Sequence, residues 1–431
     1  MKNYNENKNV YEAANERIDF IFNNFERIYM SFSGGKDSGV MLNLVLDYMR
    51  KNNITDKIGL MVLDNEANYE YSLKFMHKII KENIDLLDVY WCCLPVTLPC
   101  TVSSYEIDWQ CWGVNDEKRW IRPMPDEDYI VNIDNHKFDF FIENMSYDEF
   151  WDKFGEWYAK DKKCANFIGI RTDESLNRYR SIMNKNKTMI NNLCWTKKNT
   201  KNCYNVYPIY DWKTEDVWIA NEKYNWIYNE LYDIFWKAGL TIAQMRVASP
   251  FMSESKSSLN LYRIIDGHVW SRLCARVSGA NFIATYGKQL TYKSFTLPDG
   301  HTWKSFCKFL LDTLPKESGE NFKSRFIQSL KYWWRVGRGL EDELIEDLTK
   351  NKIDFKLGEK TRHGRKDKTC VRMIPPDHLD MLKCHNSDVT SWKRFVITIL
   401  KNDHTCKYLG LAPTHEQAKR QRIIQNKYKN I

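Results

Sequence analysis

The fold is decided by the stretch Ser33-Gly34-Gly35-Lys36-Asp37-Ser38. The residues before it, 27–32 (RIYMSF), have the pattern of a short strand, and residues 39–51 after it carry apolar side chains at helical spacing. Two glycines let the backbone approach a phosphate closely. The serine hydroxyls, the Lys36 charge and the free N–H groups of the following helix all favour an anion. The stretch therefore predicts a phosphate-binding loop, although it lacks the Walker A spacing.

An alternation of strands and helices extends outward from this loop. Helices are predicted over residues 11–26, 69–82 and 147–160, and strands over residues 57–63, 86–92, 165–170 and 206–210. Such an alternation is typical of a parallel sheet with helices on its faces. Residues 94–145 interrupt it with four prolines and three tryptophans, and we interpret them as a Trp-rich insertion near the strand ends.

The chain is expected to divide near residue 245. Beyond it the strand signals fade, and helices are predicted near residues 256–285, 301–314, 317–350 and 388–402. We therefore expect a nucleotide-binding domain over residues 1–245 and a mainly helical C-terminal region over residues 246–431.

Positive charge is concentrated at the C-terminal end. The chain holds 64 Lys and Arg against 56 Asp and Glu, a net charge of +8, and residues 360–431 account for 16 against 6. The remaining residues hold 48 against 50, which excludes a uniformly basic packaging protein. The basic tail indicates either contact with nucleic acid or another polyanion, or a solvated face. Its cations include Lys360, Arg362, Arg365, Lys366, Lys368, Lys393, Arg394, Lys419, Arg420 and Arg422.

The composition indicates a cytoplasmic protein with reduced cysteines. The N-terminus is polar, no apolar run is long enough to span a membrane, and the 12 cysteines include no C-x-x-C pair. We interpret Cys92-Cys93 and most of the 16 tryptophans as core residues. The histidines and cysteines of the tail do not match a zinc spacing.

The hexapeptide resembles the PP-loop of the superfamily of ATP pyrophosphatases and phosphoadenosine phosphosulfate (PAPS) reductases. Four further stretches resemble the PAPS reductase branch of this superfamily. These stretches are Asp64-Asn65-Glu66, residues 169–175 (GIRTDES), residues 208–218 (PIYDWKTEDVW) and Leu231-Tyr232-Asp233 with Gly239. The resemblance covers residues 27–245. It implies an α/β fold of the adenine-nucleotide α-hydrolase-like (HUP) type, with a parallel five-stranded sheet and helices on both faces. It also implies ATP or a PAPS-like adenine nucleotide as ligand, with Mg²⁺.

Nearly the whole chain resembles an IbrA-like, DUF3440-type subgroup of that family. The resemblance is carried by residues 94–95 with 109–123, 245–251 (MRVASPF), 270–286 and 391–394 with 400–403. It implies a ParB-like partner protein. In the subgroup, the stretch around Arg246 replaces the cysteine-bearing region of the reductases.

The candidate site residues follow from the loop and from these stretches. Arg171 ends a predicted parallel strand, where such folds bind ligands, and its fork suits phosphate oxygens; the alternative is an ion pair with Asp173 or Glu174. Arg246 and Arg276 are either anion contacts or structural ion pairs, and Arg122 is a weaker candidate. The catalytic candidates are Lys36, Asp37 and Arg171. The nucleotide-binding candidates are Ser33, Gly34, Gly35, Lys36, Asp37, Ser38, Asp64, Arg171, Glu174, Arg246 and Arg276.

Three functions stay open. The first is an ATP pyrophosphatase, which adenylates an acceptor and releases pyrophosphate. The second is a sulfonucleotide reductase or binder, although the chain lacks the C-terminal E-C-G-[IL]-H segment of the reductases and the paired cysteines of an iron–sulfur cluster, so no cluster is expected. The third is a nucleotide-responsive regulator that acts with a ParB-like partner or DNA.

Overall fold

The computed structural model describes residues 1–411 apart from residues 6, 257–258, 287–294, 364–365 and 383–388. It divides into two compact units. Unit 1 comprises Met1–Leu98, Gln110–Pro250 and Ser257–Arg276, and unit 2 comprises Pro99–Trp109, Phe251–Lys256 and Val277–Ile431. Residues 257–276 thus group with the N-terminal part of the chain, and residues 99–109 group with the C-terminal part.

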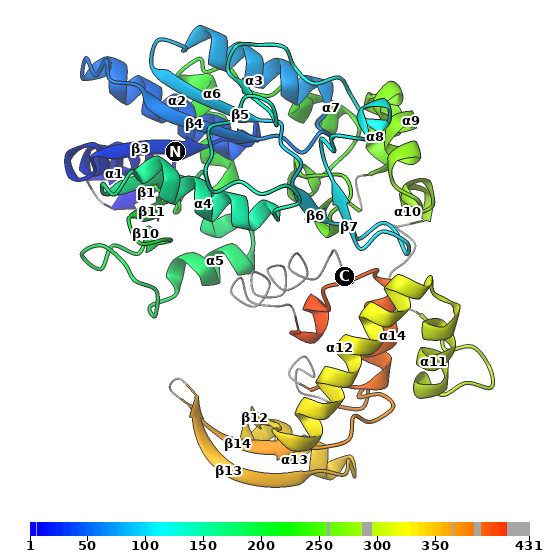
Figure 1. The fold of residues 1–431 in the computed structure, drawn as a ribbon. Coiled ribbons are helices and arrows are strands. Elements are labelled where there is room, and N and C mark those ends of the chain that lie inside the picture. Colours follow the sequence, from blue (N-terminus) through cyan, green and yellow to red (C-terminus); the bar gives the residue numbers. More distant parts are fainter. Residues whose placement is uncertain (6, 257–258, 287–294, 364–365, 383–388, 412–431) are drawn as a thin grey trace. The chain divides into compact units, whose positions relative to one another are not determined.

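Unit 1 is built on a seven-stranded sheet with the order β10-β11-β9-β3-β4-β5-β8. The strands are β3 (Arg27–Ser31), β4 (Ile58–Leu63), β5 (Leu87–Cys92), β8 (Ile130–Val131), β9 (Cys164–Phe167), β10 (Thr196–Lys198) and β11 (Cys203–Val206). All neighbours are parallel except β10 and β11. The predicted parallel α/β fold is confirmed (Figure 1). Four of the five expected strands lie where they were predicted, whereas the strand predicted over residues 206–210 lies earlier, at Cys203–Val206, and residues 208–210 form a turn that begins at Pro208. The sheet also includes β8 from the insertion and β10, which forms a hairpin with β11.

Helices cover both faces of this sheet. Tyr29 of β3 packs on Phe154 of α4, with ring centroids 5.3 Å apart. Phe167 of β9 pairs with the residue after Tyr29 and therefore faces the other side, where it packs on Phe22 of α1 at 6.3 Å. The helices of unit 1 are α1 (Val10–Asn24), α2 (Lys36–Lys51), α3 (Glu70–Glu82), α4 (Tyr147–Ala159), α5 (Leu176–Met183), α6 (Thr214–Lys223), α7 (Leu231–Lys237), α8 (Asn260–Ile265) and α9 (Gly267–Arg276).

Short elements lie among these strands and helices in the chain. They are β1 (Asn3–Asn5), β2 (Lys8–Asn9), β6 (Thr97–Pro99), β7 (Asp108–Gln110) and the 3-10 turns η1 (Glu117–Arg119), η2 (Thr172–Glu174), η3 (Ile242–Gln244) and η4 (Ser253–Ser255). The Trp-rich insertion is therefore ordered around small strands and turns. Its tryptophans Trp109 and Trp112 are buried, as expected for core residues. Of the short elements, η4 and most of β7 belong to unit 2.

Unit 2 is helical with one small sheet. Its helices are α10 (Ala280–Tyr286), α11 (Trp303–Thr313), α12 (Lys316–Arg335), α13 (Asp342–Lys350), α14 (Trp392–Leu400) and the 3-10 turn η6 (Lys407–Leu409). The sheet has the order β12-β14-β13 and consists of β12 (Arg338–Leu340), β13 (Lys356–His363) and β14 (Lys366–Arg372). Figure 1 shows the long β13–β14 hairpin in orange.

This sheet differs from the helical prediction for the region. The helix predicted over residues 317–350 ends at Arg335, because Gly337 takes a left-handed φ of +79° and turns the chain into β12. The strands β13 and β14 carry most of the cluster Lys360 to Lys368, whose charges obscured the strand pattern. Among the described residues, no helix is long and apolar enough to cross a membrane.

Candidate functional site

The predicted phosphate-binding loop leads from β3 into α2. Gly35 is the N-cap of α2 and has no side chain to cap the helix; the first N–H group of the helix, that of Lys36, is bound by the Tyr232 hydroxyl. Gly34 has a φ of +68°, and a Cβ at this position would lie 2.8 Å from Met76 Sδ, so the turn requires glycine. The Ser33 and Ser38 hydroxyl oxygens lie 3.0 Å apart. The loop thus closes on itself at the start of a 16-residue helix.

Two residues from distant parts of the chain hold the loop. The Asn229 amide donates hydrogen bonds to the Gly34 carbonyl and to the Ser72 hydroxyl, both at 2.9 Å. The backbone N–H of Lys36 donates to the Tyr232 hydroxyl at 3.0 Å. Burial raises the pKa of Tyr232, so this hydroxyl stays neutral. Sequence reasoning matched the segment around Tyr232 without giving it a role, and it gave no signal for Asn229.

The three catalytic candidates lie together at the loop. The Asp37 carboxylate bridges two cations, with Lys36 Nζ at 3.0 Å from one oxygen and Arg171 Nε at 2.7 Å from the other. The Arg171 side chain is 1% exposed and also donates to the Trp212 carbonyl and the Thr214 hydroxyl. An ion pair with Asp173 at 3.5 Å is present as well. The Lys36 ammonium group therefore has fewer protein partners than the Arg171 guanidinium, which several groups of the protein hold in place.

Gly169 sets how closely the end of β9 approaches α2. A Cβ on Gly169 would lie 2.6 Å from the Asp37 carbonyl oxygen, 2.8 Å from the Asp37 carbonyl carbon and 2.9 Å from Ser38 Cα. All three are backbone atoms of the first turn of α2, which cannot swing aside as a side chain can. Gly169, two residues before Arg171, therefore permits the contact between Arg171 and Asp37.

Replacing Gly169 by Ala should lower the free energy of unfolding by about 1–3 kcal/mol, because the added methyl group overpacks the first turn of α2. Chemical denaturation measures the change. Gly267→Ala is the matched control, since a Cβ there meets no atom within 4 Å. It should leave stability unchanged or slightly raised. Equal effects of the two substitutions would contradict this account of Gly169.

Glu174 and Arg246 lie next to Arg171. The backbone N–H of Glu174 donates to the Arg171 carbonyl at 3.3 Å, and the Glu174 carbonyl accepts from Arg246 Nη2 at 3.2 Å. The Glu174 carboxylate lies 3.8 Å from Arg178. The exposed Arg246 is thus brought to the Arg171 turn by a backbone contact.

Asp64 and Arg122 form a second buried cluster at the end of β4. The Asp64 side chain is fully buried and accepts from Trp91 Nε1 at 2.7 Å and from the Glu66 N–H at 2.8 Å. Its carboxylate is also paired with Arg122, whose guanidinium lies 4.9 Å from the Trp112 ring centroid. Arg122 Nε is buried without a hydrogen-bond partner within the described part of the chain. Asp64 is therefore neutralised by the cation that the sequence ranked as a weaker candidate.

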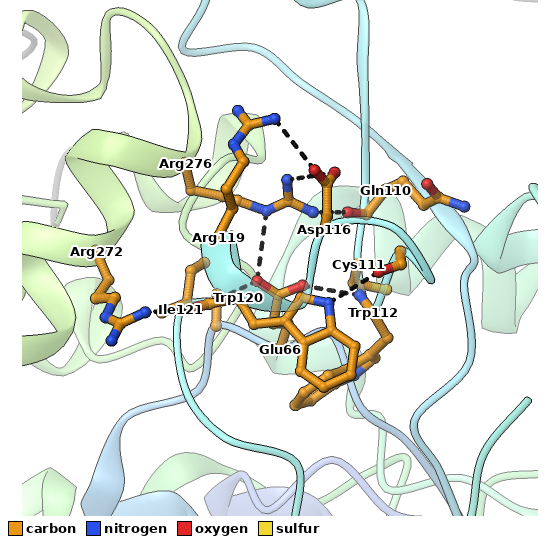
Figure 2. Close-up of polar contacts among 12 residues, drawn as sticks. Glu66, Gln110, Cys111, Trp112, Asp116, Arg119, Trp120, Ile121, Arg272 and Arg276 are labelled. Atoms are coloured by element: carbon orange, nitrogen blue, oxygen red, sulfur yellow. Dashed lines mark hydrogen bonds and ion pairs between the residues drawn. The ribbon is translucent and has the colours of Figure 1, made fainter.

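Glu66 and Arg276 continue this cluster (Figure 2). Glu66 has a left-handed φ of +66°, and its carboxylate accepts the backbone N–H groups of Trp112 and Ile121 at 2.8 Å each. Arg276 Nε lies 3.4 Å from Glu66 and its Nη1 lies 3.0 Å from Asp116. Burial raises the pKa of Glu66, and the charge of Arg276 only partly offsets this. Arg276 therefore forms ion pairs with both of these carboxylates.

Cys92 and Cys93 are core residues, and two of the predicted cations of the tail have partners within the protein. Cys92 and Cys93 are buried as expected, and burial raises the pKa of both thiols. In the tail, Lys393 pairs with Asp380 at 2.6 Å, and Arg394 donates to the carbonyls of Val389 and Tyr408. No group of three or more His, Cys, Asp or Glu side chains that could hold a metal ion occurs in the described residues. The predicted cations Arg365, Lys419, Arg420 and Arg422 lie outside the described residues.

Two family models match adjacent parts of the chain, and both lie after the loop at residues 33–38. A model described as a phosphoadenosine phosphosulfate reductase domain matches residues 122–237, and a model described as a domain of unknown function, DUF3440, matches residues 239–420. The uncharacterized protein YbdN of Escherichia coli (strain K12) is 30% identical over 413 residues, which cover 94% of this chain and 91% of YbdN. The chain therefore belongs to the PAPS reductase-like family whose members carry a DUF3440 domain.

Solved structures show weaker similarity. The FMN adenylyltransferase of Candida glabrata, in complex with FAD and inorganic pyrophosphate, is 16% identical over 52% of this chain and 59% of that one, with a TM-score of 0.32. The PAPS reductase of Candida auris, in a phosphate complex, is 13% identical over 55% of this chain and 87% of that one, with a TM-score of 0.28.

Proposed function

We propose that this protein is a cytoplasmic PP-loop enzyme that binds ATP and cleaves it at the α-phosphate, so that an acceptor is adenylated and pyrophosphate is released. The observation that carries the proposal is the start of α2 directly after Gly34 and Gly35, where the N-cap residue Gly35 supplies no side-chain cap and Lys36 takes the first helical position. Backbone N–H groups, a positive helix end and one ammonium group together suit a pyrophosphate. Membership of the PAPS reductase-like family agrees with an adenine nucleotide as ligand.

The residues of the loop would act on the leaving group. An acceptor oxygen attacks the α-phosphorus and forms a new P–O bond, while the bond to the bridging oxygen of the β-phosphate breaks. Pyrophosphate leaves with the electron pair of that bond, and the proton of the acceptor passes to solvent. The α2 N–H groups and Lys36 stabilise the charge that grows on pyrophosphate. Arg171 holds Asp37, and Asp37 in turn positions the Lys36 ammonium group.

Mg²⁺ fits this site better as part of the substrate than as a resident ion. The one carboxylate at the loop, Asp37, has both oxygens paired with cations, and a protein cage for Mg²⁺ needs further oxygen ligands. Mg²⁺ usually binds through substrate phosphates and few carboxylates. We therefore write the substrate as Mg·ATP.

The proposal predicts pyrophosphate release from Mg·ATP by the purified full-length chain. Pyrophosphate is measured by a coupled assay, and mass spectrometry of nucleotide that co-purifies with the protein identifies the ligand. The expected ligand is ATP or an adenylate. ATP that binds without any release of pyrophosphate would contradict the enzymatic part and would support the nucleotide-responsive regulator that acts with a ParB-like partner or DNA.

One observation favours a second candidate function, a sulfonucleotide reductase or binder. The PAPS reductase domain model matches residues 122–237, which include Arg171 and the residues around it. Reduction of PAPS requires two electrons from a thiol, and the product is sulfite. A co-purified phosphoadenosine species, together with thiol-dependent sulfite release and no pyrophosphate, would favour this function over ATP cleavage.

A further inference from the structure

Residues 175–210 contain no acidic side chain. Between Glu174 and Asp211 the stretch holds seven cationic residues, so its net charge is +7. The N-terminal 359 residues as a whole sum to −2, with 48 Lys and Arg against 50 Asp and Glu. A single-signed segment of this length inside a near-neutral body creates a local field that attracts polyanions. The seven are Arg178, Arg180, Lys185, Lys187, Lys197, Lys198 and Lys201.

The two ends of this basic segment are held together beside Arg171. At its start, Ser175 caps α5, four residues after Arg171. At its end, the Tyr210 carbonyl accepts the backbone N–H of Thr172 at 2.8 Å. The segment therefore leaves and returns at the turn that carries Arg171, which follows the carboxyl end of β9. Parallel α/β sheets bind their ligands at this side.

Several of these cations are available to a ligand. Arg180, Lys185 and Lys201 are exposed, and their side chains form no hydrogen bond or ion pair in the part of the chain that the structure describes. Lys187 differs, because its ammonium group donates to the carbonyls of Ile182 and Cys194 and so holds the segment in shape. The folded segment thus presents three unpaired charges from α5 and from the two loops that follow it.

Helix α5 adds an apolar stripe to this charged segment. Leu176, Tyr179 and Met183 have the i, i+3, i+7 spacing of one helix face, and they are 61%, 50% and 41% exposed. The helix buries only Ile182. An exposed aromatic ring that adjoins the unpaired Arg180 in the chain suits a strand whose bases can stack and whose phosphates can pair.

We propose that residues 175–210 bind single-stranded nucleic acid, with phosphates on Arg180, Lys185 and Lys201 and a base stacked on Tyr179. The strand then runs past the Arg171 turn at the PP-loop, which makes it the class of acceptor for the adenylyl group. An oxygen of the strand attacks the α-phosphorus of ATP, pyrophosphate leaves with the bonding electron pair, and a hydroxyl proton passes to solvent. This acceptor assignment rests on the proposed function, whereas the binding does not.

Fluorescence anisotropy without ATP tests the binding, with labelled single strands of RNA and DNA of about 20 nucleotides in separate arms. The variant Arg180→Glu/Lys185→Glu/Lys201→Glu should bind at least about tenfold more weakly in low salt, and its salt slope should fall by about 2. Lys51→Glu/Lys78→Glu/Lys81→Glu makes the same change in net charge on α2 and α3 and should bind as the wild type does. No binding by the wild type, or equal losses in both variants, would overturn the proposal.

Two further measurements separate stacking from charge and binding from turnover. Tyr179→Ala should weaken binding by about 5- to 100-fold with an unchanged salt slope, and unchanged affinity would overturn the stacking contact. Pyrophosphate release should rise when the strand is added, and the triple Glu variant at residues 180, 185 and 201 should lose this rise. If the rate of pyrophosphate release is the same with and without a bound strand, the acceptor assignment is overturned. Absence of release under every condition would instead contradict the proposed function and leave the binding result standing.

Discussion

Replacing Arg276 by Met should lower the free energy of unfolding by about 3–5 kcal/mol, because it leaves a buried carboxylate without its cation. Glu66 is fully buried, and Arg276 is the cation within 3.4 Å of it. The substitution keeps the apolar volume of the side chain, so the loss reports the charge rather than a cavity. Chemical denaturation at neutral pH measures it. A loss below about 1 kcal/mol, the usual worth of an exposed pair, would contradict the account.

The pH dependence provides an internal control for this prediction. The pKa of Glu66 is already raised by burial, and removal of Arg276 removes the charge that acts to lower it. A carboxyl group whose pKa is raised in the folded state stabilises the protein below its unfolded pKa and loses that contribution as pH rises through the folded pKa. The deficit of Arg276→Met should therefore grow as pH rises above the unfolded pKa of a glutamate, about 4.3. Adding Glu66→Gln should flatten this growth, with a coupling of about 1–3 kcal/mol between the two substitutions.

Local sequence signals and the parallel topology were sufficient for the contact between Asp37 and Arg171, although these residues lie 134 positions apart. The loop at residues 33–38 and Arg171 both follow a strand directly, and in a parallel sheet the carboxyl ends of neighbouring strands meet at one edge. The strands β3 and β9 are such neighbours, which brings Asp37 and Arg171 into contact. Pattern and topology together therefore predict this contact.

The missed residues act over long separations or through conformation. Asn229 lies 195 positions from the Gly34 carbonyl that it holds, and no periodicity reports such a contact. The pairing of Arg276 with Glu66 depends on the left-handed turn at Glu66, which the sequence does not mark with a glycine. A third feature was missed because the net charge was summed over the whole N-terminal part. Its total of −2 conceals the net charge of +7 on residues 175–210. Windows of about 30 residues would have found it, because charge patterning is a local property.

The geometry also separates the two cations that the sequence treated alike. Arg171 is 1% exposed and its guanidinium is bound by Asp37, Trp212 and Thr214, so its replacement would disturb the protein before it disturbed a ligand. The Lys36 ammonium group has Asp37 as its hydrogen-bond partner, and it belongs to the first residue of α2. A phosphate that approaches the start of α2 can therefore recruit Lys36 without breaking the core.

Lys36→Ala should for this reason reduce pyrophosphate release by about 10²–10³-fold, or about 2.7–4 kcal/mol, as expected for one preorganised group that stabilises the leaving charge. The free energy of unfolding should change little, because Asp37 keeps its ion pair with Arg171 after the pair with Lys36 is lost. Lys51→Ala, at the exposed end of the same helix, is the matched control and should release pyrophosphate at the rate of the wild type. A Lys36→Ala variant that folds and releases pyrophosphate at the wild-type rate would show that the loop does not bind the leaving group. If ATP affinity falls but the release rate at saturation does not, Lys36 binds the ground state and transition state equally, and the catalytic role passes to the N–H groups of α2.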